Sequence, residues 1–220
     1  MTEIKVLRNI LAANEDRAAQ NRARFGVRGL LAVNLIASPG AGKTTLLERT
    51  IAGLSPRLRV AVIEGDITGD HDARRIAAAG AAVVQVNTEG GCHLDAAMVD
   101  RALGELDLDA VDILVIENVG NLVCPAEFDL GEAFKAVVLS APEGDDKPAK
   151  YPLIFSEAGA VVVNKTDLLA ATDFDLAKAE RDIRRINPDV PLFPLSCRTG
   201  QGLDAWLEWL AARRAEYAKH

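Results

Sequence analysis

The sequence predicts an α/β fold with a mostly parallel central sheet, helices on both of its faces, and a helix that precedes it. Two observations support this fold class. Continuous apolar, β-prone runs alternate with helical patterns along most of the chain, and strands of that kind are typical of parallel sheets covered on both faces. The chain has 220 residues, of which 49% are hydrophobic, and this suffices for one such domain with a full core.

A helix is expected over most of residues 1–29, because apolar residues recur there at helical spacing. Its polar continuation to Arg24 is expected to be exposed and to precede the core. The predicted organisation is therefore a helical extension over residues 1–29, followed by one nucleotide-binding domain over residues 30–220. The apolar positions are Ile4, Leu7, Ile10 and Leu11.

The rest of the chain divides into elements whose ends carry turn signals, such as Ser55-Pro56 after one helix and Gly80 after the next. Residues 143–150 have the composition of a linker. The predicted strands are Leu31–Ala37, Arg59–Glu64, Ala82–Val86, Ile113–Glu117, Ala136–Ser140, Ala160–Asn164 and Leu192–Leu195. The predicted helices are Thr45–Leu54, Ala73–Ala79, Leu94–Leu106 and residues 152–158, 174–186 and 202–217.

A glycine-rich loop connects the first strand to the next helix. Gly40 and Gly42 allow successive N–H groups to point into one concavity, where they and the helix N-terminus can hold phosphate oxygens. Lys43 adds a mobile charge, and the Thr44 hydroxyl is placed to bind the Mg²⁺ that bridges the phosphates. Ala37 replaces the first glycine of the usual pattern, where only a small residue is needed. The pattern predicts a P-loop NTPase, and a coincidental Gly-Lys-Thr is disfavoured because both flanks match. The candidate phosphate-binding residues are Gly40, Ala41, Gly42, Lys43, Thr44 and Thr45.

The strand that ends at Asn164 is followed by Lys165, Thr166 and Asp167. A carboxylate two residues beyond a lysine can accept paired hydrogen bonds from the ring N–H and the exocyclic amine of guanine, a donor pair that adenine lacks. The alternative is a solvated turn, since these residue types are common in loops. Downstream of a phosphate loop, the pattern is similar to that of GTP-binding proteins. The candidate guanine-binding residues are Asn164, Lys165 and Asp167, with Ser196, Cys197 and Arg198 in the loop after the last strand.

Acidic residues follow two other strands, at the edge where parallel sheets bind ligands. Asp66 follows the second strand and Glu117 ends the fourth, and both can hold Mg²⁺ directly or through water and orient the attacking water. Gly120 lies close enough for its N–H to sense a γ-phosphate. A loop-capping role is the alternative for Asp66. The candidate catalytic residues are Lys43, Asp66, Glu117 and Gly120, and the candidate Mg²⁺ ligands are Thr44, Asp66 and Glu117.

Three soft or borderline metal ligands are predicted at the same edge. Cys92 and His93 follow the third strand, and Cys124 follows the fourth. Structural Zn²⁺ usually takes four ligands, and a symmetric dimer with two such sets side by side would complete the coordination. The alternative is that both cysteines are small buried residues and that His93 forms a hydrogen bond at a helix start. Cys197 is expected to pack rather than to bind a metal.

The charge balance disfavours some classes of function. The 25 Lys and Arg residues and 32 Asp and Glu residues give a net charge of −7, which argues against a broad nucleic-acid or anionic-membrane surface. No apolar stretch reaches the length of a membrane span and no apolar signal segment is evident, so a cytoplasmic location is expected. The 3 cysteines form an odd, sparse set, which argues against a disulfide framework.

These motifs resemble those of the HypB-type GTPases, which are SIMIBI-type P-loop GTPases that help to insert nickel into nickel–iron hydrogenases and are related to the urease accessory GTPase UreG. The resemblance covers nearly everything from Val33 to about Leu210. Its most specific parts are Cys92-His93 and the string from Glu117 to Pro125, because the similar site of UreG has no second such cysteine. The other matching segments are Ser38–Thr45, Glu64–Asp66, Glu143–Asp146 and Asn164–Asp167.

The resemblance implies a metallochaperone and slow GTPase that delivers nickel during hydrogenase maturation, with GTP, Mg²⁺ and either Ni²⁺ or Zn²⁺ as ligands. It implies a GTP-promoted homodimer that binds the metal through Cys92, His93 and Cys124 near the subunit interface, with Lys150 reaching the partner subunit's nucleotide. The implied partners are other hydrogenase maturation proteins and the hydrogenase large subunit, without nucleic acid or membrane. Residues 1–30 contain no Cys or His, unlike many family members, so high-affinity nickel storage is not expected.

Three other interpretations are open at this point. In a nickel or zinc carrier or scaffold, GTP would only stabilise the dimer and hydrolysis would be incidental. A related nickel-delivery GTPase for urease would use the same chemistry. A P-loop small-molecule kinase is disfavoured by the guanine pattern, and a preference for ATP over GTP would revive it.

Overall fold

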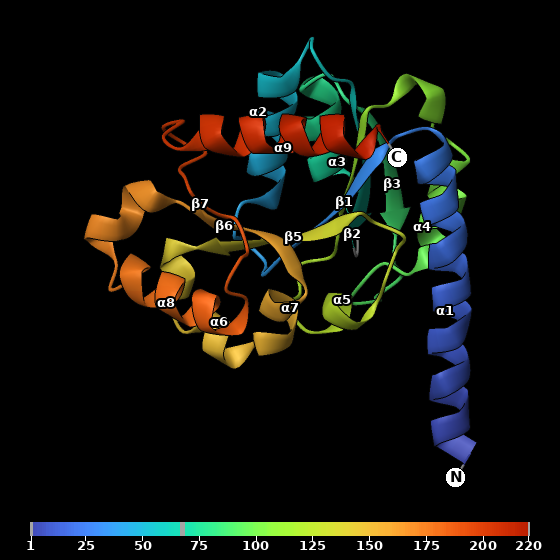
Figure 1. Ribbon diagram of the computed structural model, residues 1–220, viewed down its shortest axis with the longest axis horizontal. Helices are drawn as coiled ribbons and strands as arrows, with labels where there is room; N and C mark the ends of the chain where they lie inside the picture. Colours follow the sequence, from blue (N-terminus) through green and yellow to red (C-terminus); the bar gives the residue numbers. More distant parts are fainter. Residues whose placement is uncertain (1, 67–68, 220) are drawn as a thin grey trace.

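The computed structural model describes residues 2–66 and 69–219, and for residues 2–10 it describes the backbone only. Within this part of the chain, one 7-stranded sheet has the order β3-β2-β4-β1-β5-β6-β7, and all neighbouring strands are parallel (Figure 1). The predicted fold class is therefore confirmed. The strands are β1 Leu31–Ala37, β2 Val60–Asp66, β3 Ala82–Asn87, β4 Ile113–Glu117, β5 Phe134–Ser140, β6 Ala158–Asn164 and β7 Leu192–Pro194.

Helices cover both faces of this sheet (Figure 1). On one face lie α2 Lys43–Leu54, α3 His71–Ala78 and α9 Leu203–Tyr217. On the other lie α1 Thr2–Val27, α4 Ala96–Leu103, α5 Cys124–Glu127, α7 Pro152–Ser156 and α8 Leu176–Ile186, with α6 Lys147–Lys150 beside α7 and α8. The described residues also form the short 3-10 helices η1 Leu108–Ala110, η2 Ala141–Glu143 and η3 Thr166–Ala171.

The central strand β1 shows how the sheet is buried on both faces. All of its residues are buried, and successive side chains point to opposite faces. Leu31 and Leu35 join the core with α2 and α9, whereas Ala32 joins the core with α1 and α4. The core shared with α2 and α9 also contains Trp206, whose buried ring lies 5.5 Å from that of Phe193 between centroids. The phosphate loop therefore starts from the middle of the sheet.

The helix predicted over Leu94–Leu106 is shorter in the structure. It begins at Ala96, because the side chain of Asp95 accepts a hydrogen bond from the backbone N–H of Met98 (2.7 Å) and so caps the helix. It ends before Gly104. The residues just before the cap are therefore left in a loop.

The segment predicted to be a linker, residues 143–150, is ordered by its own polar side chains. Glu143 accepts hydrogen bonds from the backbone N–H and the hydroxyl of Ser140, which forms a capping box. Asp145 pairs with Lys178 of α8 (2.9 Å), and α6 follows directly. The segment has the polar composition of a linker because several of its residues form capping hydrogen bonds and ion pairs.

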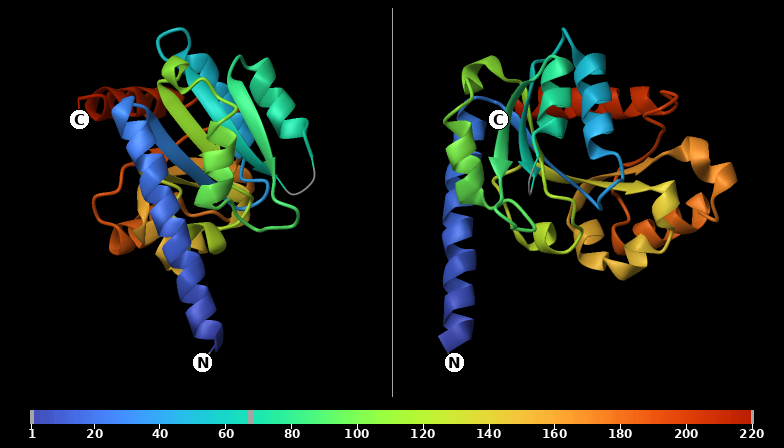
Figure 2. Two further views of the ribbon diagram at one scale, coloured as in Figure 1. Left: turned by 90° about the vertical axis from the view of Figure 1, so that its right-hand side faces the viewer. Right: turned by 180° about the vertical axis from the view of Figure 1, so that it is seen from behind.

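The expectation that the polar half of the N-terminal helix is exposed is wrong for one of its faces. Ala18, Asn21 and Phe25 are all 0% exposed, and this face of α1 packs against α4 and the segment after α5. Figures 1 and 2 show the first turns of α1 extending past the rest of the molecule. The side chains of Ile4, Leu7 and Ile10 lie outside the described residues, so the predicted apolar stripe is not tested.

Candidate functional site

The loops that carry the predicted site residues all follow strands of the parallel sheet. Because every strand runs in the same direction, the loops after β1, β2, β4 and β6 meet at one edge, where ligands bind in such sheets. The sequence therefore places a phosphate loop, two acidic loops and the Asn-Lys-x-Asp loop side by side.

The phosphate loop has the backbone that its glycines allow. Gly40 and Gly42 have φ values of 77° and 96°, in the left-handed region that favours glycine, and α2 begins at Lys43. A Cβ added at Gly42 would lie 2.6 Å from Nδ2 of Asn164, so a side chain has no room there. The free N–H groups at the start of α2 can therefore face a phosphate.

Asn164 connects the phosphate loop to both of the loops that are predicted to bind the base. Its amide donates to the carbonyl oxygen of Ala41 (3.0 Å) and accepts from the backbone N–H groups of Lys165 (2.7 Å) and Cys197 (3.2 Å). Lys165 has a φ of 61° and donates from Nζ to the carbonyl oxygen of Gly40 (2.6 Å). The stem of Lys165 thus lies across the phosphate loop.

Asp167, the predicted guanine-binding carboxylate, lines a cavity beside the phosphate loop. Its Oδ1 accepts a hydrogen bond from the hydroxyl of Ser196 (2.6 Å), which in turn accepts from the backbone N–H of Thr199 (3.2 Å). A cavity of about 400 Å³ opens beside this carboxylate. It is lined by Gly42, Thr45, Arg49, Asn164, Lys165, Asp167, Leu168, Cys197 and Arg198.

Cys197 is a packing residue of this pocket, as expected. It is 3% exposed, its carbonyl oxygen accepts from Nε of Arg49 (2.9 Å), and burial raises the pKa of its thiol to about 11. A thiol with that pKa stays protonated at neutral pH and is a poor metal ligand.

A second cavity, of about 300 Å³, is lined by Lys43 and by the acidic loops. The hydroxyl of Thr44 donates to Oε1 of Glu117 (3.0 Å). Among the described residues, Oε2 of Glu117 and Oε2 of Glu64 are buried and have no hydrogen-bond partner. The cavity is lined by Pro39, Gly40, Lys43, Glu64, Gly65, Asp66, Asp72, Glu117, Asn118, Val119 and Gly120.

The buried carboxylates of this cavity fit a divalent cation. Burial, aided by the charge of Glu117, raises the pKa of Glu64 to about 8. Burial also raises the pKa of Glu117 to about 7, against the opposing effects of Lys43 and the Thr44 hydroxyl. Such groups are costly to keep charged without a cation, and hard oxygen ligands suit Mg²⁺. Glu64 was not among the predicted Mg²⁺ ligands. Its position two residues before Asp66 in the same strand was a usable signal.

Gly120 brings the loop after β4 against the phosphate loop. A Cβ at this position would lie 3.0–3.2 Å from three atoms of Pro39, so only glycine allows this approach without displacement. The backbone N–H of Gly120 is therefore near the cavity that would hold the outer phosphates. Asp66 lines the same cavity and is half-buried.

Cys92, His93 and Cys124 come together as predicted. Their ligand atoms all lie within 4.8 Å of one another, with 3.0 Å between the two Sγ atoms and 3.5 Å between Sγ of Cys92 and Nδ1 of His93. Cys92 is exposed and the other two are half-buried. Burial lowers the pKa of His93, which favours the neutral imidazole that binds metals. The cluster supplies 3 ligands, so a metal held here has room for further ligands.

Asn118, which follows β4, connects this cluster to the acidic loop. Its Oδ1 accepts from the backbone N–H groups of Leu94 (3.0 Å) and Val119 (3.0 Å), and its Nδ2 donates to Asn34 (3.2 Å). The side-chain amide of Asn118 thus joins the backbone after His93 to the backbone before Gly120. Sequence reasoning missed this role, because an asparagine in a loop carries no signal for its distant partner.

Lys150 is not at the nucleotide pocket of its own chain. It ends α6, its side chain is 61% exposed, and Nζ pairs with Asp146 (2.6 Å). A contact with a partner subunit's nucleotide is compatible with this exposure and stays a prediction.

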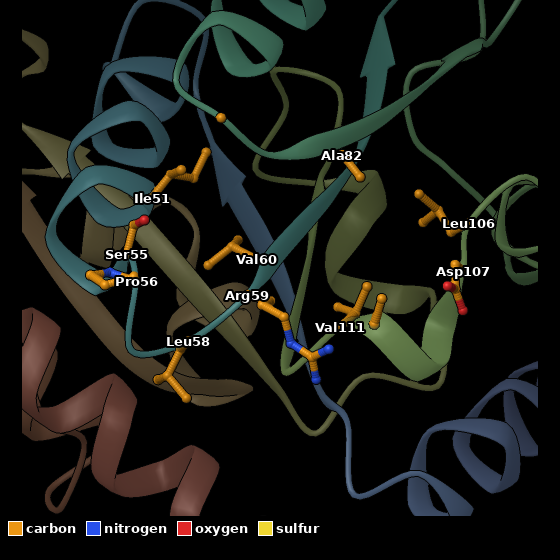
Figure 3. Close-up of a pocket in the computed structure, with 12 residues that line it drawn as sticks. Ile51, Ser55, Pro56, Leu58, Arg59, Val60, Ala82, Leu106, Asp107 and Val111 are labelled. Carbon is orange, nitrogen blue, oxygen red and sulfur yellow. The ribbon is translucent and has the colours of Figure 1, made fainter.

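Another cavity, of about 390 Å³, lies at the opposite edge of the sheet, where β2 and β3 begin (Figure 3). Figure 3 shows mainly aliphatic side chains around it, including Ile51, Leu58 and Val111. Its arginine, Arg59, already pairs with Asp112 (3.1 Å). This cavity offers no chemistry that resembles the site at the carboxyl ends of the strands.

These loops define a P-loop nucleotide-binding protein with a thiol–imidazole cluster beside the phosphate cavity. Residues 31–194 match the family model described as "CobW/HypB/UreG, nucleotide-binding domain". Hydrogenase maturation factor HypB of Azotobacter vinelandii is 52% identical over 211 residues, which cover 96% of this chain and 70% of that protein. The chain belongs to the CobW/HypB/UreG family, and within it to the HypB proteins.

Two solved structures agree with this membership. The crystal structure of HypB from Helicobacter pylori in complex with nickel has a TM-score of 0.88 and 37% identity, covering 93% of this chain and 96% of that one. HypB from Archaeoglobus fulgidus has a TM-score of 0.87 and 36% identity, covering 92% and 99%. Over the described residues, the structure contains no helix that is both long and apolar enough to cross a membrane.

Proposed function

We propose that this protein is a Mg²⁺-dependent GTPase that handles nickel during hydrogenase maturation. The observation that carries the proposal is the juxtaposition of a guanine-type nucleotide pocket with the Cys92–His93–Cys124 cluster, joined through Asn118. Membership of the HypB family supports the role in hydrogenase maturation. The proposed partners are other maturation proteins and the hydrogenase large subunit.

The nucleotide pocket supports GTP rather than ATP. Asp167 would accept hydrogen bonds from the ring N–H and the exocyclic amine of guanine, and Lys165 would lie along the base. The loop of Ser196, Cys197 and Arg198 closes the other side of the pocket. Adenine would leave the half-buried carboxylate without its donors, and such mismatches are strongly rejected.

The phosphate cavity supports hydrolysis with a low intrinsic rate. Thr44, Glu117 and Asp66 would hold Mg²⁺, with Glu64 nearby, and the bound ion would neutralise charge on the phosphate oxygens. Lys43 and the Gly120 N–H would contact the outer phosphates. The described lining contains a lysine but no arginine, so little stabilises the charge that spreads over the phosphoryl group in the transition state. We therefore expect turnover to be slow without a partner.

The thiol–imidazole cluster would bind the cargo ion, Ni²⁺ or Zn²⁺. Thiolates and imidazole suit both ions, and three ligands from one chain leave the coordination sphere incomplete. A homodimer promoted by GTP would bring a second cluster close, and Lys150 would then reach the partner subunit's nucleotide. Exposure of Cys92 and of the Lys150 side chain supports this arrangement.

The decisive experiment measures metal stoichiometry and oligomeric mass with GTP, with a non-hydrolysable analogue and without nucleotide. The proposal predicts metal binding by the wild-type protein and its loss in Cys92→Ser with Cys124→Ser, while GTP hydrolysis persists. Undiminished metal stoichiometry in the double variant would refute the site. If the analogue supports full metal transfer to an acceptor, GTP acts only as a structural ligand, and the carrier interpretation replaces the GTPase one.

A further inference from the structure

The polar half of α1 contacts the two segments that follow the proposed metal ligands. Asn14 and Asn21 lie about two turns apart on one face of the helix. The amide of Asn14 donates to the carbonyl oxygen of Asp129 (2.8 Å) and accepts from the backbone N–H of Ala96 (2.9 Å). The amide of Asn21 donates to the carbonyl oxygens of Ala96 (2.9 Å) and Leu130 (3.1 Å). Each asparagine therefore bridges the same two segments.

These segments are the direct continuations of the ligand-bearing loops. Ala96 begins α4 shortly after Cys92 and His93, and Asn14 satisfies its N–H, which has no partner inside the helix. The segment at 129–130 follows Cys124 and the short helix α5. Phe128, at the end of α5, packs its ring against that of His93, with 4.0 Å between centroids.

The contact with α1 is close and buried. Asn21 is 0% exposed and Asn14 is 8% exposed. Gly131, with a φ of +92°, passes so near the helix that an added Cβ would lie 2.6 Å from the carbonyl oxygen of Ala18. The backbone after Cys124 is therefore shaped to lie against this face of α1, and the two asparagines hold it at a fixed distance from α4.

We propose that α1 positions the metal site: Asn14 and Asn21 fix the separation between the loop that carries Cys92 and His93 and the loop that carries Cys124. They are positioning residues, because they contact neither metal nor nucleotide. The inference rests on the proposed metal-binding function. A site built on two separate loops binds a metal well only if its ligands are held near their bound positions, and supporting groups of this kind commonly change metal affinity 10- to 100-fold.

The test compares two double variants of the full chain. Asn14→Ala with Asn21→Ala removes both bridges. The matched control, Arg17→Ala with Arg24→Ala, removes two ion pairs between α1 and Asp100 of α4 but leaves both bridges. Affinities for Ni²⁺ and for Zn²⁺ are measured by competition with a chromophoric chelator, well below the melting temperature of each variant. The thiolate-to-nickel charge-transfer spectrum is recorded at saturation.

We expect the asparagine double variant to bind either ion about tenfold more weakly than the wild type and to have an altered charge-transfer spectrum, while the arginine double variant keeps both. GTP hydrolysis without added nickel or zinc should be unchanged. Wild-type metal affinity and spectrum in the asparagine variant would overturn the proposal, even if its melting temperature falls. If that variant does not fold, Asn21→Ala alone, which keeps the Asn14 bridge, must still weaken binding.

The failure of this inference can be distinguished from that of the proposed function. If the wild type binds no metal, or binds it equally well after Cys92→Ser with Cys124→Ser, the metal site itself is wrong. If the wild type binds through these cysteines and the asparagine variants bind equally well, only the positioning role of α1 is wrong.

Discussion

The nucleotide pocket and the thiol–imidazole cluster lie at the same edge of the sheet, but different kinds of contact hold them in place. The pocket is built on loops that leave buried strands directly, and its parts touch one another: Asn164 contacts the phosphate loop, and Ser196 contacts Asp167. The residues that would bind the nucleotide therefore hold one another in position.

The cluster depends instead on residues outside it. Cys92 is exposed. The backbone that follows His93 is held by hydrogen bonds to Asn118 and to Asn14 and Asn21 of α1, which is distant in sequence. A self-supporting pocket should respond to mutation of its own residues, whereas the cluster should also respond to mutations that touch no ligand. The predictions below test this difference, from the largest expected effect to the smallest.

Lys43→Ala should lower the rate of GTP hydrolysis by at least about 100-fold, because the lysine supplies the mobile positive charge of the phosphate cavity. Release of inorganic phosphate measures the effect. Metal stoichiometry should not change, since Lys43 is not one of the ligands of the cluster. Arg57→Ala, an exposed residue just beyond the other end of α2, is the charge-matched control and should hydrolyse GTP at the wild-type rate. Wild-type turnover in Lys43→Ala would remove this lysine from the mechanism.

Asp167→Asn should weaken GTP binding by about 100-fold, because the amide donor would face the guanine amine. Xanthosine triphosphate, which presents a carbonyl oxygen at that position, should bind the variant better than GTP does. Titration with fluorescent analogues of both nucleotides measures the preference. The exposed Asp173→Asn is the control. If the variant keeps the wild-type preference for GTP, the base lies elsewhere.

The sequence predicted which loops come together at the candidate nucleotide pocket, because its signals are local. A strand, a glycine turn and a helix follow one another from Leu31 to Leu54. The adjacent residues Gly42, Lys43 and Thr44 are enough to predict a phosphate-binding loop. The same holds for the three candidate metal ligands, which lie in the loops after β3 and β4. Parallel strands then place these loops at one edge without further information.

The supporting contacts could not be predicted because their partners are far apart in the chain. Asn118 and Asn21 are polar residues whose sequence neighbours say nothing about Leu94 or Leu130. The polar stretch of α1 therefore resembled an exposed face, although its amides satisfy buried backbone groups of other segments. The burial of Glu64 among other acidic residues likewise depends on β4 lying beside β2.

Asn118→Ala should reduce the influence of GTP on metal affinity, because it removes the amide that joins the backbone beside His93 to the loop containing Gly120. Coupling between sites typically changes affinity 5- to 150-fold, and we expect the ratio of metal affinities with and without a GTP analogue to fall toward one. Chelator competition in both states measures the ratio. Asn187→Ala removes a different bridging amide, which donates to the backbone carbonyl oxygens of Phe155 and Ala158 just beyond the end of α8, and it should keep the wild-type ratio.

The smallest expected effect is on the pH dependence of stability without nucleotide. Both Glu64 and Glu117 have a pKa raised from 4.5, to about 8 and about 7. The folded state therefore binds more protons than the unfolded state in this interval. The stability that this contributes is fully present below pH 4.5 and is lost as the pH rises through the two raised values.

The melting temperature of the nucleotide-free protein should therefore fall between about pH 6 and pH 8, and less steeply in Glu64→Gln, whose neutral amide resembles the protonated acid. Mg²⁺ with GTP should also flatten the profile, because the cation stabilises the charged carboxylates. The exposed Glu89→Gln is the control and should keep the wild-type slope. Equal slopes in the wild type and Glu64→Gln would mean that Glu64 is already charged in the empty cavity, and the phosphate cavity would then need no cation to stabilise it.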